Sequence, residues 1–342
     1  MTRIATAALA LLLPVCVVDG QGTWERLTSG TAASLRGLNV VSDQVVWASG
    51  SKGTVLHTLD GGTNWRVDTI PGASKLDIRA VHARSASVAH AAATAGRIWR
   101  TTDGGQSWSL RYQASDTTVF LDAIAFWDDL HGMALGDPLD GRFFILTTSD
   151  GGDSWREAPA DSRPVTVNGE AAFAASGTSL LLLPKGVALI GSGGKAARVH
   201  RSADVGTTWT VVDLPIQSGS GANGIFSLAF QSATSGIAVG GDYRTPDSTQ
   251  ASAAVTRDGG KTWSAASTMP SGYRSGAALS GRSLAVAVGT NGSDVSYDSG
   301  TTWTPFDKTG FNSVQIAPNG TAFAVGDRGS VARLDTHSLT KK

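Results

Sequence analysis

The segment Thr101-Thr-Asp103-Gly-Gly105-Gln-Ser-Trp108 decides the fold, because its pattern [Ser/Thr]-x-Asp-x-Gly-x-x-Trp occurs six times along the chain. A pattern that returns at a regular interval is the sequence signature of a repeat architecture. The six copies, called the Asp boxes below, span residues 58–65, 101–108, 148–155, 202–209, 256–263 and 296–303.

The Trp residues that close the boxes measure the repeat. Successive Trp residues from Trp65 to Trp303 are separated by 43, 47, 54, 54 and 40 residues, and Trp24 lies 41 residues before Trp65. This interval is typical of one four-stranded blade of a β-propeller. Abundant Gly together with Val, Ala, Ser and Thr favours short strands joined by tight turns.

Each repeat has the same interior: a short apolar run, a turn, a small-residue run ending in Gly, and an alternating strand that leads into the box. The residues 227–230, 236–240 and 253–256 illustrate it. Seven such interiors can be counted, and the seventh, at 313–334, has no closing Trp. Trp24-Glu-Arg-Leu27 supplies a strand without an inner partner. The sequence therefore predicts an all-β, seven-bladed propeller over residues 21–342, with its last blade closed by the N-terminal strand.

Bulk composition narrows the classes of partner. Lys plus Arg equals Asp plus Glu at 28 each, so the formal net charge is zero. That balance argues against nucleic acid as a partner. Residues 1–20 read as an export signal, with Arg3 before an apolar stretch too short for a good transmembrane helix. We expect a secreted or periplasmic monomer with no transmembrane anchor in the mature chain; lipidation at Cys16 is the less favoured alternative.

The boxes themselves read as scaffold. Each Asp can accept turn N–H groups, the Ser or Thr hydroxyl can bond locally, and the Trp can pack between sheets. Each box offers about one carboxylate, whereas calcium loops need several oxygen ligands in series. The six His residues lack metal-ligand spacing. We expect no metal and no cofactor, and structural roles for Asp60, Asp103, Asp150, Asp204, Asp258 and Asp298.

Strand order indicates where a site would lie. Boxes join strands three and four, counted from the inside, on one face of the ring. The long connections join strands two and three, or one blade to the next, on the opposite face, which we call the long-loop rim. Loops on a rigid scaffold are where function usually lies. The candidate binding residues there are Asp137, Arg142, Glu170, Asp242, Tyr243, Arg244, Tyr273 and Arg274.

The boxes, the seven interiors and the export signal together resemble the photosystem II stability/assembly factor family of Asp-box propellers. The resemblance implies a non-enzymatic assembly factor that binds a protein precursor. A broader resemblance is to BNR-repeat sialidases, which need an Arg cluster, a Tyr nucleophile paired with Glu, and an acidic catalyst. Their Arg-Ile-Pro signature precedes the first box, whereas the nearest string here is the late Tyr243-Arg244-Thr-Pro246.

Two functions follow as hypotheses. The first is an exported binding or assembly propeller that recognises a protein partner, or a polar or glycan ligand, at the long-loop rim. The second is a sialidase-like glycoside hydrolase in which Glu170 or Asp242 acts as proton donor or base and Tyr243 or Tyr273 acts as nucleophile or positions the substrate. It requires two carboxylates about 5–10 Å apart across a pocket.

Overall fold

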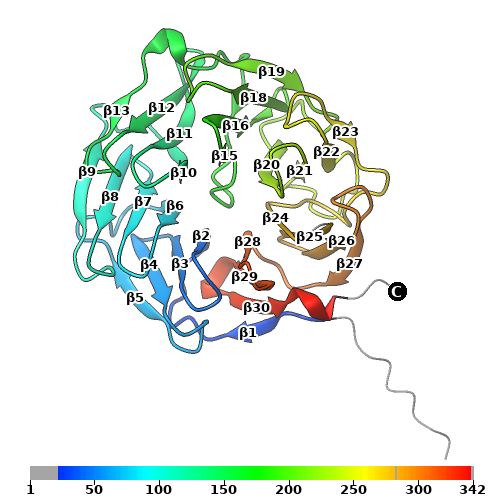
Figure 1. Ribbon diagram of the computed structural model, residues 1–342, viewed down its shortest axis with the longest axis horizontal. Coiled ribbons are helices and arrows are strands. Elements are labelled where there is room, and N and C mark those ends of the chain that lie inside the picture. The colour runs from blue at the N-terminus through cyan, green and yellow to red at the C-terminus, as the bar shows by residue number, and fades with distance from the viewer. Residues whose placement is uncertain (1–21, 282, 340–342) are drawn as a thin grey trace, which may run out of the picture.

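The computed structural model describes residues 22–281 and 283–339, and shows seven sheets arranged as a ring around a central axis (Figure 1). The expected export segment 1–20, including Cys16, lies outside the described residues and stays a prediction. Within the described ranges no helix is long and apolar enough to cross a membrane.

The first three blades are regular four-stranded antiparallel sheets, ordered from the inside outward. Their strands are β2 (Leu35–Val40), β3 (Val46–Gly50), β4 (Thr54–Thr58) and β5 (Arg66–Thr69); β6 (Ile78–Ala83), β7 (Ala89–Ala93), β8 (Arg97–Thr101) and β9 (Ser109–Gln113); β10 (Leu121–Phe126), β11 (Gly132–Leu139), β12 (Arg142–Thr148) and β13 (Arg156–Glu157).

Blades 4 to 6 carry the insertions. Their strands are β15 (Leu180–Leu183), β16 (Val187–Gly191), β18 (Arg198–Ser202) and β19 (Thr210–Asp213); β20 (Asn223–Phe230), β21 (Gly236–Asp242), β22 (Ala253–Thr256) and β23 (Ser264–Ala265); β24 (Gly276–Ser280), β25 (Leu284–Gly289), β26 (Gly292–Ser296) and β27 (Thr304–Asp307). Two short strands, β14 (Glu170–Ala171) and β17 (Gly193–Gly194), extend the fifth sheet on its inner side, in the order β14-β17-β20.

The seventh blade confirms the expected closure. It contains β28 (Ser313–Ile316), β29 (Thr321–Val325), β30 (Val331–Asp335) and, outermost, β1 (Glu25–Leu27). β1 pairs antiparallel with β30, and the two lie side by side at the bottom of Figure 1. Trp24 anchors β1, because its ring packs edge-on to Phe311 at 5.2 Å and its Nε1 donates to Ser293 Oγ at 3.0 Å.

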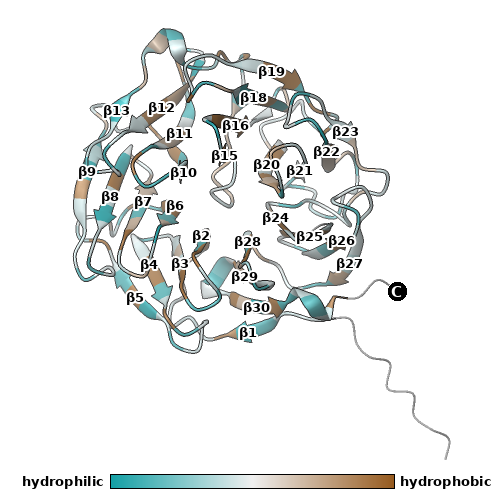
Figure 2. Ribbon diagram, in the orientation of Figure 1, coloured by the Kyte–Doolittle hydropathy of each residue, from teal (hydrophilic) through white to brown (hydrophobic). Residues whose placement is uncertain are grey.

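The core lies between the blades. Strand two is rich in small residues in several blades, as in β7 (Ala89–Ala93), which lets neighbouring sheets approach closely in the inner part of the ring. Apolar residues from adjacent blades form the buried clusters, for example Leu38 and Leu56 of blade 1 with Phe323 of blade 7. Brown apolar stretches accordingly follow the strands in Figure 2, while many of the connections are pale or teal.

All six boxes adopt one hydrogen-bond pattern in the hairpin between strands three and four. The Ser or Thr hydroxyl donates to the Asp Oδ1 at 2.7–2.9 Å and accepts the N–H of the Gly two residues after the Asp at 2.8–3.0 Å. The same Oδ1 accepts the backbone N–H four residues later. Each Asp is therefore saturated by its own turn, and no group of three or more potential metal ligands occurs among the described residues.

Residues 172–178, called the plug below, cross the central opening between β14 and β15 (Figure 1). Phe173 stacks on Phe226 of blade 5 with ring centroids 3.9 Å apart. The Ser176 carbonyl accepts Ser313 Oγ of blade 7 at 3.2 Å. Gly177, at φ +73°, lies against Ala80 of blade 2. The plug thus touches blades on several sides of the ring.

Candidate functional site

A repeated β-bulge builds the mouth of the propeller. In β2, β6, β10 and β20 the pairing register shifts by one residue, leaving Arg36, Arg79, Asp122 and Phe226 without an opposite partner. A bulge redirects the side chain of its extra residue. All four residues line one cavity of about 450 Å³ on the long-loop rim, which we call the mouth cavity.

The plug and the rim loops complete this cavity. Its further lining includes Asp137 at the end of β11, Phe173 and Ala175 of the plug, and Tyr243 and Tyr273 from two rim loops. Phe226 lies at the centre of the aromatic wall, with Tyr273 edge-on at 4.8 Å and Tyr243 at 6.2 Å. The cavity therefore combines charged groups from blades 1 to 3 with an aromatic wall from blades 5 and 6.

The charged groups of the mouth cavity have shifted protonation equilibria. Burial raises the pKa of Asp122 well above its ordinary range; the nearby Asp137 adds to the rise and Arg79 opposes it. Burial also raises the pKa of Asp137, against the hydrogen bond that its Oδ1 accepts from the Ala172 N–H at 3.2 Å. Burial and then Arg36 lower the pKa of Arg79. Burial and neighbouring like charges shift pKa values in these directions.

Asp137, Tyr243 and Tyr273 are the sequence-predicted rim residues that share this cavity. Asp242 lies at the rim, where its Oδ1 accepts the Arg244 N–H at 2.8 Å. The Arg244 guanidinium lies 5.8 Å from the Tyr243 ring centroid. These three neighbours form an exposed polar edge beside the cavity.

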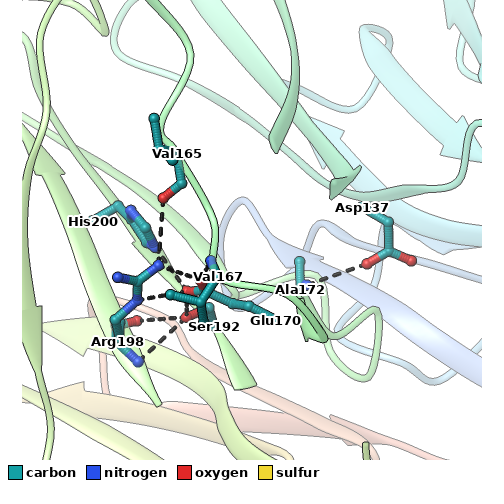
Figure 3. A network of polar contacts seen from close by, with 8 residues as sticks. All are labelled: Asp137, Val165, Val167, Glu170, Ala172, Ser192, Arg198 and His200. Atoms are coloured by element: carbon teal, nitrogen blue, oxygen red, sulfur yellow. Dashed lines mark hydrogen bonds and ion pairs between the residues drawn. The ribbon is translucent and has the colours of Figure 1, made fainter. Parts of the chain in front are cut away.

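Glu170 and Arg274 are placed differently from the expected open rim. The Glu170 carboxylate is fully buried and accepts hydrogen bonds from Ser192 Oγ at 2.5 Å, Arg198 Nε at 3.1 Å and the Val167 N–H at 2.9 Å, and it contacts His200 Nε2 at 2.9 Å (Figure 3). Burial alone would raise its pKa, but the bonds from His200, Arg198 and Ser192 outweigh burial and lower the pKa to about 2. Glu170 therefore fastens the 165–171 loop to blade 4 and has no free oxygen for a ligand.

Arg274 is also buried. Its side chain has no exposed surface, pairs with Asp294 through Nε at 2.6 Å, and donates to the Tyr273 carbonyl at 2.6 Å. Arg142 lies apart from the mouth, where its Nη1 donates to the Arg163 carbonyl at 2.7 Å. Both arginines hold rim loops in place.

Sequence reasoning missed Arg36, Arg79, Asp122 and Phe226, because it searched the long loops and these residues lie inside strand one. A signal for them exists. The segments Leu35-Arg-Gly-Leu38, Ile78-Arg-Ala-Val81, Leu121-Asp-Ala-Ile124 and Ile225-Phe-Ser-Leu228 align across the repeats. Three of the four place a charge between apolar residues at the same point of the innermost strand.

The BNR/Asp-box repeat family matches residues 254–265, which contain the whole of the fifth box. The chain is a seven-bladed Asp-box β-propeller. No curated protein matches it in sequence.

Solved structures give the same fold. YCF48 bound to a D1 peptide superposes with a TM-score of 0.66 at 17% identity, covering 94% of this chain and 99% of that one. YCF48 from Cyanidioschyzon merolae gives 0.67 at 17%, over 92% and 99%. An ancestral GH74 enzyme gives 0.64 at 12%, over 90% of this chain and 45% of the enzyme. The comparisons support the expected resemblance to photosystem II assembly factors, and at these identities the likeness to the solved structures is one of fold.

Proposed function

We propose that this Asp-box propeller is a non-enzymatic binding protein, of the assembly-factor kind, that recognises a protein segment across its long-loop rim. The observation that carries the proposal is the shape of that rim. The mouth cavity shares Thr290, Asn312 and Asp327 with a second cavity of about 440 Å³, which extends between blades 6 and 7 as far as Arg26 on β1. The two cavities together form a groove from the axis to the outer edge.

The groove suits an extended chain better than a compact ligand. Its outer part is lined by residues 309–312 and 327–331, a mixture of small, polar and apolar residues that includes the exposed Arg328. Its inner end has the aromatic wall of Phe226, Tyr243 and Tyr273. Large aromatic residues at the centre of a patch and polar residues at its edge are the usual composition of a protein-binding surface.

No observation favours the glycoside hydrolase. Glu170, the proton donor or base of that hypothesis, is buried and saturated by four hydrogen-bonding groups. Tyr273 is also buried, and burial raises the pKa of its phenol, away from the phenolate that a nucleophile needs. Asp242 therefore lacks Glu170, the second carboxylate with which the hypothesis paired it.

Photo-crosslinking at single sites tests the proposal. A photoreactive residue in place of Tyr243 or Arg328, both exposed on the rim, should crosslink one common partner in cells that make the protein. The matched control is the exposed Leu59 in the first box, on the opposite face. Capture of the same partner from Leu59, or none from either rim site, would contradict recognition through the rim.

A further inference from the structure

The mouth cavity contains cationic and donor groups that lack acceptors. The Arg36 guanidinium has no hydrogen bond or ion pair with any residue in the described part of the chain. Arg79 donates from Nη2 to Asp77 at 2.9 Å, but its buried Nε has no acceptor. The two guanidinium groups are close enough for Arg36 to lower the pKa of Arg79. Two neighbouring cations that line one partly desolvated cavity are stabilised by an anion bound there.

Asp122 adds a third unsatisfied group at the same wall. Its side chain is buried, no hydrogen bond satisfies it, and its Oδ2 has no partner among the described residues. Burial and the neighbouring Asp137 favour the protonated carboxyl, which is an O–H donor. A buried donor without an acceptor costs free energy, so the wall formed by Arg36, Arg79 and Asp122 is complete only with a ligand that accepts hydrogen bonds.

The acidic side chains around the cavity limit how much negative charge a bound anion can carry. Asp137 lies near Asp122. Asp327, which is on blade 7, lies near Arg36 and accepts a hydrogen bond from Asn312 Nδ2 at 3.1 Å. A doubly charged phosphate would be repelled by these carboxylates. A singly charged, planar carboxylate matches the guanidinium fork and can accept the O–H of a protonated carboxyl.

We propose that the mouth cavity is a binding site for a carboxylate whose apolar body lies against the aromatic wall. The carboxylate accepts hydrogen bonds from Arg36, Arg79 and Asp122, and the body contacts Phe173 and Phe226, whose stacked rings face the same cavity. A free organic acid and the C-terminus of a peptide ending in an apolar residue share this chemistry. The site goes beyond the proposed partner recognition and does not depend on it.

Calorimetric titration of the full protein with three probes tests the site. N-acetyl-leucine carries the carboxylate and an apolar body, N-acetyl-leucinamide carries the same body without the charge, and an N-acetylated pentapeptide ending in Leu extends the chain. We expect N-acetyl-leucine to bind at least about tenfold more tightly than the amide, as loss of a charge-assisted hydrogen bond requires. If the pentapeptide binds more tightly still, the source is a chain end; if it does not, the source is a free acid.

Variants at the wall sharpen the test. Arg36→Gln should weaken binding of N-acetyl-leucine by about tenfold or more while changing thermal unfolding little, because Arg36 makes no hydrogen bond or ion pair with the described residues. Asp122→Asn keeps a donor and the shape, so it should retain binding and abolish the weakening that ionisation of Asp122 causes at high pH. Arg156→Gln, at an exposed site on β13, is the control.

Three results would overturn the proposal: no binding of N-acetyl-leucine, equal binding of its amide, or an Arg36→Gln variant that binds as the parent does. None of these would affect the crosslinking result at Tyr243 and Arg328, so failure of the carboxylate site and failure of partner recognition are distinguishable.

Discussion

At the scale of single residues, the six box aspartates and the rim acids differ in what surrounds them. Hydrogen bonds from Ser107 and Thr101 lower the pKa of Asp103 to about 2, and those from Thr208 and Ser202 do the same for Asp204. Asp122 and Asp137, which are more deeply buried, have raised pKa values. The same residue type is thus a turn constraint on one face of the ring and an uncommitted polar group on the other.

The Arg274–Asp294 pair gives a stability prediction at this scale. Both side chains are fully buried, so Asp294→Asn leaves the Arg274 charge without its counter-ion. We expect the free energy of unfolding to fall by about 3–5 kcal/mol, as breaking a buried pair does. Asp68→Asn, which breaks the exposed Arg66–Asp68 pair, is the matched control and should cost about 1 kcal/mol or less. Urea unfolding of both variants measures the difference; equal losses would contradict it.

Residue-level prediction from the sequence succeeded where a turn chemistry repeats and failed where register decides. The hydrogen bonds of each box form within the motif itself. The roles of Thr101, Asp103 and Gly105 can therefore be predicted from the sequence alone. The residues around Arg36 do not predict that it occupies a bulge. A bulge is a mismatch in the pairing of two strands, so it is seen only when the partner strand is known. Likewise, the sequence predicts Glu170 as an exposed loop residue, because its partners Arg198 and His200 come from blade 4, about 30 positions later.

At the scale of elements, the plug determines what kind of site the mouth is. Residues 172–178 contact blades 2, 5 and 7 from inside the ring and supply part of the aromatic wall of the mouth cavity through Phe173. Residues 172–178 match no part of the repeat, and for that reason the sequence periodicity did not place them inside the ring.

Phe173→Ala tests whether the plug is held by its stacking on Phe226. Removing the ring deletes the 3.9 Å stacked contact, while the hydrogen bonds of Ser176 and Thr178 remain. We expect faster amide hydrogen exchange confined to residues 172–178, because local opening depends on local contacts. Phe306→Ala, on the outer strand β27, should leave exchange in the plug unchanged. Unaltered exchange in the plug of Phe173→Ala would show that its backbone contacts suffice.

At the scale of the whole molecule, acid stability is set by histidines packed between blades. His82 on β6 and His90 on β7 both lie against the Phe126 ring of blade 3, at 5.0 and 4.7 Å. Burial, with Arg84 adding, lowers the pKa of His82 to about 4, and burial with His82 lowers that of His90 to about 3. Burial lowers the pKa of His57 as well. All three are neutral in the folded protein at neutral pH.

The sign of the pH effect follows from those shifts. The unfolded chain takes up protons below its ordinary His pKa of about 6.5, and the folded protein does not until about pH 4 or 3, so stability falls as the pH drops through that window. By pH 5 the loss should approach about 2 kcal/mol for each of His82 and His90. Urea midpoints at pH 7.5 and 5.0 measure it, and His90→Gln, which can keep a donor toward the Gly151 carbonyl, should reduce the difference. An unchanged difference in that variant would exclude His90 as a source.

The ring closure affects the order in which the blades can fold. Glu25 and Arg333, which pair across β1 and β30, are 308 positions apart in the sequence. During synthesis β1 therefore waits, with Trp24 uncovered, until nearly the entire chain exists. The last blade cannot assemble before both ends are available, so closing the circle is the final and most long-range step of folding. A chain interrupted shortly before residue 331 would keep six complete blades and an open edge on either side of the gap, the kind of surface on which another strand adds.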